Sequence, residues 1–119
     1  MDTSSKNYVV KDNIVASGWA SGVRLPAYKC GESATNTGNV AHSIAGYGLI
    51  VHVGAGACSE FSDFKAYKIR MGAIHMGGSL GSAKNYLHSV VTVDSSSGIM
   101  AFGAGGGHIE VADSTIYGS

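Results

Sequence analysis

Short apolar segments recur along the chain, and each begins just after a glycine. The segments are VRL after Gly22, LIVHV after Gly48, AIHM after Gly72 and IMAF after Gly98. A fifth stretch of this kind starts near the C-terminus and reaches Gly118, and the successive glycines lie 26, 24, 26 and 20 residues apart. Because the apolar segments fall at one phase of this spacing, the pattern predicts a repeat that places an extended strand once in each copy.

An asparagine or aspartate stands nine residues before three of these glycines, at Asn13, Asn39 and Asp63. Asn and Gly tolerate positive φ angles, so both sets of residues are predicted to occupy tight turns between strands. We expect the side chains of Asn13, Asn39 and Asp63 to stack as a ladder that bonds between neighbouring copies. The alternative is that Asn and Gly only mark unrelated loops.

The spacing favours a right-handed parallel β-helix over other repeat architectures. Helical repeats need about 33 residues or more, and leucine-rich repeats need leucines in register, whereas the chain has four leucines. In a parallel β-helix, two or three short strands form each coil, and the coils stack about 4.8 Å apart. The sequence therefore predicts an all-β solenoid of four to five coils, a fragment of a longer one. The expected coils lie near 8–33, 34–58, 59–84, 85–106 and 107–119.

The composition is typical of one small domain and argues against several partners. The chain has 119 residues, of which 45% are hydrophobic and 13% charged, and its formal net charge is +0. Without a basic run, nucleic acid is not expected as a partner. No apolar stretch approaches the roughly 20 residues that span a bilayer, so this segment is not expected to insert into a membrane. The N-terminal MDTSSKNY lacks the layout of a signal peptide, which leaves the compartment open.

The repeat copies read NIVASGWASGVRL, NVAHSIAGYGLIVHV, CSEFSDFKAYKIRMGAIHM and VVTVDSSSGIMAFGAGGGHIEVADSTIYGS. In this order they resemble the parallel β-helix region of the fibrocystin family, which includes fibrocystin, fibrocystin-like protein, transmembrane protein 2 and the cell migration-inducing hyaluronidase. The resemblance runs from about Asn13 to Ser119. The loop 103–107 is shorter than in the family, which indicates a distant eukaryotic relative. The resemblance implies a membrane-anchored ectodomain that is extracellular or lies on the cell or cilium surface.

The resemblance and the predicted solenoid architecture together lead to three functional hypotheses. The first is a rigid structural and interaction segment, whose partners are other segments of a larger parent chain or neighbouring chains of an assembly, with glycan as a further candidate. The second is a fragment of a carbohydrate-active β-helix enzyme of hyaluronidase or polysaccharide lyase type. The third is a solenoid subunit that assembles into filaments. Clustered carboxylates with a cation in a groove would favour the enzyme, whereas scattered charges would favour the structural segment.

The two cysteines fall at nearly the same phase of adjacent copies. Cys30 lies eight residues after Gly22, and Cys58 lies ten residues after Gly48. Stacked coils would bring them close enough for a disulfide, which needs a Cα separation of about 5.5 Å. Such a bridge would indicate an oxidising compartment. The alternative is a pair of buried or loop thiols in a reduced protein.

The sequence gives little support for a cofactor or a metal. The chain has five histidines without metal-ligand spacing, so neither is predicted: His42, His52, His75, His88 and His108. The glycine-rich stretches match no phosphate-binding motif. Trp19, Tyr47 and Met71 precede repeat glycines, and we expect them to pack against the coil, although a solvent-facing aromatic column would favour glycan binding.

Catalytic candidates come from the acidic residues. Glycosidic cleavage needs an acid and a base or nucleophile about 5 to 9.5 Å apart. The available carboxylates are Glu60, Asp63, Asp94, Glu110 and Asp113, and the accompanying cations are Arg24, Arg70, Lys65 and Lys68. None of these positions matches a catalytic residue of the family. Each is therefore expected to serve the structure, and no catalytic residue is assigned.

Overall fold

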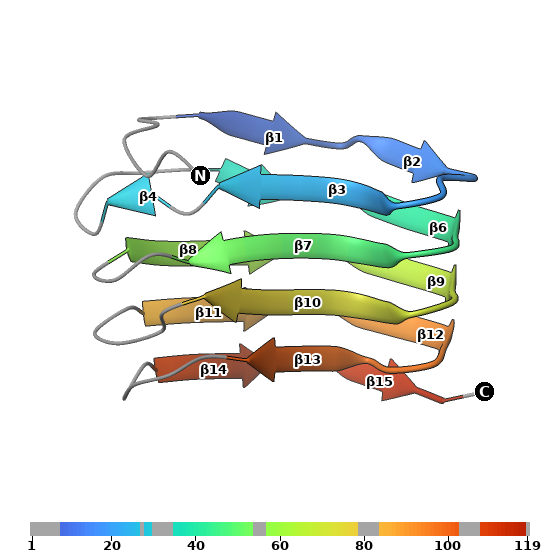
Figure 1. Ribbon diagram of the computed structural model, residues 1–119. Helices are drawn as coiled ribbons and strands as arrows, with labels where there is room; N and C mark the ends of the chain where they lie inside the picture. The colour runs from blue at the N-terminus through green and yellow to red at the C-terminus, as the bar shows by residue number, and fades with distance from the viewer. Residues whose placement is uncertain are drawn as a thin grey trace.

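The chain forms short strands that return to the same three sheets (Figure 1). The computed structural model describes residues 8–26, 28–29, 35–53, 57–78, 84–102 and 108–118. Sheet A contains, in spatial order, β1(Val9–Lys11), β5(Thr35–Thr37), β8(Ala57–Ser62), β11(Lys84–His88) and β14(His108–Ala112). Sheet B contains β2(Ile14–Ala16), β6(Val40–Ile44), β9(Lys65–Ile69), β12(Val91–Ser95) and β15(Thr115–Tyr117). Sheet C contains β3(Ser21–Pro26), β7(Tyr47–Val53), β10(Gly72–Gly78) and β13(Ile99–Phe102).

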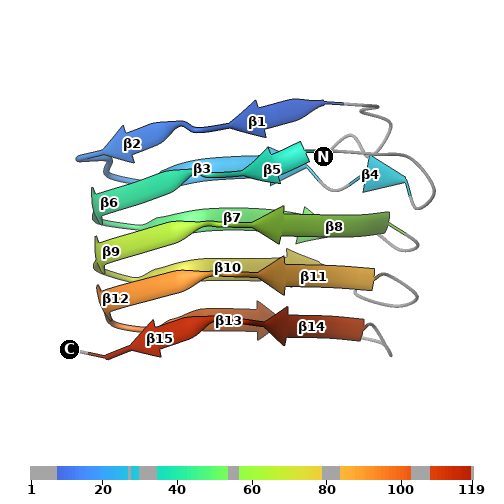
Figure 2. The ribbon, with the colours of Figure 1, turned by 180° about the vertical axis from the view of Figure 1, so that it is seen from behind.

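The three sheets are parallel, and each turn of the chain adds one strand to each of them. The described chain is thus a parallel β-solenoid of about three turns, which confirms the predicted all-β parallel fold. The body consists of the turns β5–β6–β7, β8–β9–β10 and β11–β12–β13. Figures 1 and 2 show β1 to β3 at one end of this body and β14 and β15 at the other. The short strand β4(Tyr28–Lys29) lies beside the solenoid and pairs antiparallel with β8.

Equivalent residues of successive turns stack into columns that fill the interior. In sheet C, Val23, Leu49 and Ile74 occupy one register position, and all three are buried. In sheet A, Phe61 and Leu87 occupy another such position. Strand side chains alternate between the two sides of a sheet, so every second residue points inward and is covered by the turns above and below.

Small residues line the interior next to sheet B, where the backbones of the turns approach one another closely. Ala41 and Ala66 pair in sheet B and are fully buried. A Cβ atom on Gly22 would lie 2.7 Å from the carbonyl oxygen of Gly48, and one on Gly48 would lie 2.6 Å from that of Ala73. Gly22 and Gly48 are therefore required by close packing between turns, whereas the sequence pattern had predicted positive φ angles for them.

Positive φ angles mark two corners of the turn. The corner between sheets A and B has φ values between 49° and 70° at Asp12, Gly38, Asp63, Ser89 and Asp113. The corner at the end of the sheet B strands has φ values between 51° and 59° at Ser17, Ser43, Lys68 and Asp94. Asp and Gly suit the first corner because both tolerate the left-handed region. The ladder asparagines follow this corner by one residue, so the turn chemistry and the ladder belong to neighbouring positions.

The third repeat copy is shifted by one residue from the alignment that matches Asp63 with Asn13 and Asn39. Because Val40 pairs with Lys65, Asn39 stands next to Phe64, and Asp63 stands next to Gly38 at the corner. The nine-residue interval between Asp63 and Gly72 also separates Phe64 from Ala73, so the interval could not reveal the shift.

The repeat glycines consequently divide into two groups. Gly98 precedes Ile99, which pairs with Ile74, so Gly98 shares the register position of Gly22, Gly48 and Ala73. Gly72 pairs instead with Tyr47, one position earlier. Gly118 follows Tyr117, the partner of Val93, and so lies beside the second corner.

Candidate functional site

The outward side of sheet A gathers ionisable and aromatic side chains from neighbouring strands. We call this group the sheet A face; its members are Glu60, Tyr86, His88, His108 and Glu110. Glu60 in β8, Tyr86 in β11 and Glu110 in β14 occupy the same register position. They point outward because their neighbours Phe61 and Leu87 fill the interior.

Tyr86 is the centre of this face. Its ring centroid lies 5.9 Å from that of His88 and 6.2 Å from that of His108. His108 Nε2 lies 3.8 Å from Glu110 Oε2, and both side chains are about half exposed, at 61% and 47%. A phenol, two imidazoles and two carboxylates on one open surface provide groups that donate and accept protons.

The two carboxylates of the sheet A face stand two strands apart. Their backbones are therefore separated by about 9.6 Å, twice the spacing of neighbouring strands. Inverting glycoside hydrolases hold their acid and base about 6.5 to 9.5 Å apart, which leaves room for a water molecule between the base and the sugar. The backbone separation of Glu60 and Glu110 is close to this range, and Asp63 and Asp113 stand two strands apart in the same way at the first corner.

A hollow of about 240 Å³ borders the sheet A face between β5 and β8, and Thr35, Asn36, Thr37, Glu60 and Ser62 line it. The two strands pair at Thr37 and Ser62. Next to this pair, Asn36 Nδ2 donates hydrogen bonds to the Glu60 carbonyl oxygen at 3.1 Å and to Tyr8 Oη at 3.3 Å. Its buried Oδ1 has no hydrogen-bond partner among the residues that the structure describes. Burial raises the pKa of the Tyr8 phenol above its ordinary value, and the hydrogen bond from Asn36 offsets part of this rise.

The other predicted charged residues lie away from the sheet A face. Asp63, Asp94 and Asp113 stand at the corners with positive φ angles, and Lys68 lies beside Asp94. Arg24 is on the outward side of sheet C, where it pairs in register with Ile50. Lys65 is on the outward side of sheet B, and Arg70 follows the end of β9. The predicted basic residues therefore do not join Glu60 and Glu110.

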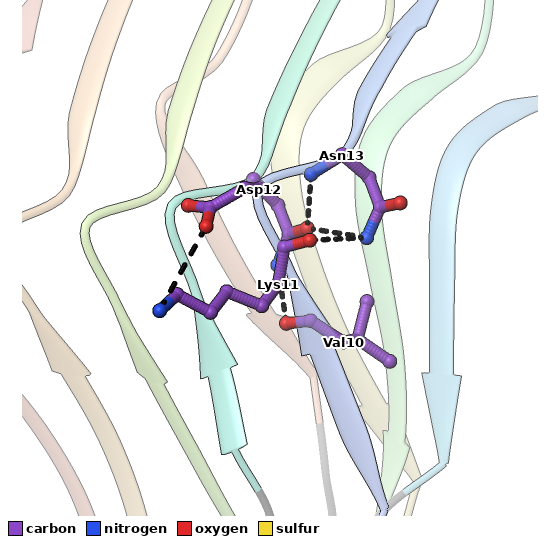
Figure 3. Close-up of polar contacts among 5 residues, drawn as sticks. Val10, Lys11, Asp12 and Asn13 are labelled. Atoms are coloured by element: carbon purple, nitrogen blue, oxygen red, sulfur yellow. Dashed lines mark hydrogen bonds and ion pairs between the residues drawn. The ribbon is translucent and has the colours of Figure 1, made fainter.

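The predicted asparagine pair forms the hydrogen bonds of the first corner (Figure 3). Asn39 Oδ1 accepts hydrogen bonds from the Asn13 backbone N–H at 3.1 Å and from Asn13 Nδ2 at 3.0 Å. Asn39 Nδ2 donates to the Val10 carbonyl oxygen at 2.9 Å. In the last described turn, Ser114 Oγ accepts from the Val90 N–H in the same way. Asp63 takes no part in this ladder, since Phe64 occupies the equivalent place.

Each histidine side chain that the structure describes lies beside an aromatic ring. The rings of His42 and Tyr67 are stacked in sheet B, with centroids 4.7 Å apart and an angle of 2° between planes. His75 lies beside Tyr47 in sheet C, with centroids 4.6 Å apart. The side chain of His52 lies outside the described residues. Among the described residues, no three His, Cys, Asp or Glu side chains gather as a metal site would require.

The predicted disulfide involves a residue outside the described part of the chain. Cys58 is buried in β8, and the described residues include no free cysteine. Tyr28 pairs with Cys58 across β4 and β8, which brings the chain two residues before Cys30 next to Cys58. Cys30 itself lies outside the described residues, so the bridge remains a prediction.

The aromatic residues of the outward columns were not predicted from the sequence. Trp19 and Met71, which we expected to pack against the coil, are 89% and 52% exposed. Tyr86 and Tyr67 had not been singled out, although Tyr86 lies 26 residues after Glu60 and Tyr67 lies 25 after His42. This spacing equals the length of one turn and could have predicted that each pair shares a register position.

Comparison with protein-family models, curated proteins and solved structures finds no match for this chain. Among the described residues there is no helix of the length and apolar character that crossing a membrane requires.

Proposed function

We propose that the chain is a rigid structural and interaction segment of a β-helix ectodomain. The observation that carries this proposal is the dispersal of its charged groups: none of the predicted basic residues joins Glu60 and Glu110, and the polar hollow holds one carboxylate, that of Glu60. A solenoid of this kind presents flat, regularly spaced outer faces, which suit contacts with other proteins.

We infer a right-handed solenoid of four to five coils. The course of the strands in Figures 1 and 2 supports this inference, since the chain runs along sheets A and B in one direction, returns along sheet C, and descends steadily from β1 to β15. Side chains in the inward register positions of the last strands are exposed, with Val111 at 44% and Ile116 at 54%. A further coil, from a larger parent chain or from a neighbouring chain, would cover them.

The resemblance to the fibrocystin family supports a location outside the cell or on the cell or cilium surface. We expect an antibody against the chain to stain intact cells of its source. Staining that requires permeabilised cells would contradict this location. Non-reducing peptide mapping should also recover Cys30 and Cys58 as one linked fragment, because the bridge forms in an oxidising compartment.

An assay for polysaccharide cleavage distinguishes the structural role from a catalytic one. The purified chain is incubated with uronate-containing and neutral polysaccharides, and the polymer length is followed by size-exclusion chromatography with light scattering. We expect no shortening of any polymer. Shortening that a Glu60→Gln variant abolishes would overturn the structural proposal.

The alternative is a carbohydrate-active enzyme or its fragment, and the shared column of Glu60, Tyr86 and Glu110 is the observation in its favour. One carboxyl group would protonate the leaving glycosidic oxygen, while the other removes a proton from the attacking water. Under this alternative, Glu60→Gln and Glu110→Gln each abolish cleavage, whereas Asp94→Asn, on another sheet, leaves it unchanged.

A further inference from the structure

The outward side of sheet B is the apolar face of the solenoid. We call it the sheet B face, and it consists of two columns: Ile14, Val40, Lys65, Val91 and Thr115, and Ala16, His42, Tyr67, Val93 and Tyr117. Its exposed large side chains include Ile14 at 73%, Tyr67 at 39%, Val93 at 37% and Tyr117 at 69%. The side chains between these columns, such as Ala41 and Ala66, are buried in the interior. Tyr67, Val93 and Tyr117 lie on the adjacent strands β9, β12 and β15, so exposed apolar and aromatic side chains adjoin along one column, which is typical of an interaction site.

The charges around this face fit a second copy of the same chain. Among the residues of the two columns, Lys65 is the one lysine, and there is no arginine or carboxylate. At the edge of the face, Lys68 and Asp94 follow the paired residues Tyr67 and Val93, so they occupy one register position on the adjacent strands β9 and β12. Both side chains are exposed. A positive and a negative charge in neighbouring turns make this edge complementary to itself when the stacking direction is reversed.

We propose that two copies of the chain pack their sheet B faces together around a two-fold axis. The axis runs parallel to the strands and passes between β9 and β12. It places Tyr67 opposite Val93 of the second copy, and Lys68 opposite Asp94 of the second copy. A two-fold axis repeats every such contact, so both ion pairs form at once and the columns are covered from β6 to β15, while β2 lies beyond the overlap.

The size of the face sets the strength of this association. The four overlapping strands, spaced about 4.8 Å apart and each presenting about 16 Å of length, give a surface of roughly 300 Å² on each copy. This area is smaller than that of stable interfaces, which bury about 800 Å² on each partner, so we expect a weak dimer in rapid exchange with the monomer. This inference rests on the proposed structural role, and it names a second copy of the chain as the partner of the segment.

Sedimentation velocity of the whole chain, from micromolar to millimolar concentration, tests the proposal. We expect a dimer that increases with concentration, and at least a tenfold weaker association for Tyr67→Glu. The matched control is Tyr86→Glu on the sheet A face, which should leave association unchanged. Circular dichroism and the thermal midpoint of each variant establish that it is folded.

A charge swap tests the geometry. Lys68→Asp and Asp94→Lys should each weaken association, because each variant places like charges opposite one another. The double variant K68D/D94K should restore it, because the pairs form again with their signs exchanged. Both positions keep positive φ angles, which Lys and Asp already occupy there.

Three outcomes would overturn the inference: a monomer at every concentration, a dimer that Tyr67→Glu leaves unchanged, or a charge swap without rescue. In the second case, the partner copy occupies another surface. None of these results affects the proposed structural role, which depends on the polysaccharide assay and on the cellular location.

Discussion

Sheets A and B carry opposite chemistry on the same repeating scaffold. The sheet A face presents carboxylates, imidazoles and a phenol, while the interior behind it is filled by the large side chains of Phe61 and Leu87. The sheet B face presents apolar and aromatic groups, while small residues such as Ala66 lie behind it. The turn determines which positions face outward, but it leaves the residue type in each column open. A solenoid can therefore carry a polar face and an apolar docking face on neighbouring sheets.

The largest expected effect on stability is the difference between an inward column, behind the sheet A face, and an outward column, on the sheet B face. Leu87 is 0% exposed, and we expect Leu87→Ala to lower the free energy of unfolding by about 2 to 5 kcal/mol, because it leaves a cavity between turns. Val91→Ala, on the outward side of sheet B, should cost less than about 1 kcal/mol. Urea denaturation measures both values. Equal losses would contradict the assignment of the two columns to the interior and the surface.

The predicted disulfide should stabilise sheet A more than sheet B. A bridge between Cys30 and Cys58 closes a loop of 28 residues, which is worth about 3 to 4 kcal/mol if the constraint acts mainly on the unfolded chain. Reduction should also release β8, the strand that carries Cys58, so hydrogen exchange should increase more in β5 and β8 than in β9 and β12. A reductant that changes neither exchange nor the thermal midpoint would rule out the bridge.

The corner between the two sheets offers an intermediate effect. Asn39 is 3% exposed, and its side chain joins Asn13 to the Val10 carbonyl oxygen. Asn39→Ala leaves these partners without bonds and should cost about 1 to 3 kcal/mol. Asn13→Ala, at the exposed end of the pair, should cost less than about 1 kcal/mol. Thermal unfolding distinguishes the two variants, and a larger loss for Asn13→Ala would contradict the buried role of Asn39.

The fold could be predicted from the sequence because its physical requirements recur at nearly constant spacing. Gly22, Gly48 and Gly98 recur because a Cβ atom there would meet the next turn or a packed side chain. The register of the third copy could not be predicted, since Asp63 and Gly72 preserve the same interval one residue away from Phe64 and Ala73. Small residues satisfy either alignment, and backbone pairing decides between them.

The candidate site was harder to predict than the fold. Glu60 and Glu110 were recognised as acids, but their shared column depends on the strand register, which the acids themselves do not specify. Lys68 shows the same limit, because lysine is not a typical residue for a φ of 54°, and its corner was not predicted. Outward columns tolerate many residue types, so their chemistry becomes apparent only after the strands have been aligned.

The smallest expected effect concerns the edge of sheet A, at Tyr8. Burial raises the pKa of Tyr8 above its ordinary value of 10.0, so the folded chain holds the phenol proton more tightly than the unfolded chain. This contribution to stability is fully present below the unfolded pKa and is lost as the pH rises through the folded pKa. The thermal midpoint should therefore decrease more steeply above about pH 10 in the native chain than in Tyr8→Phe, which lacks the proton. Parallel curves for the two proteins would show that the phenol of Tyr8 contributes nothing to the stability of the sheet A edge at high pH.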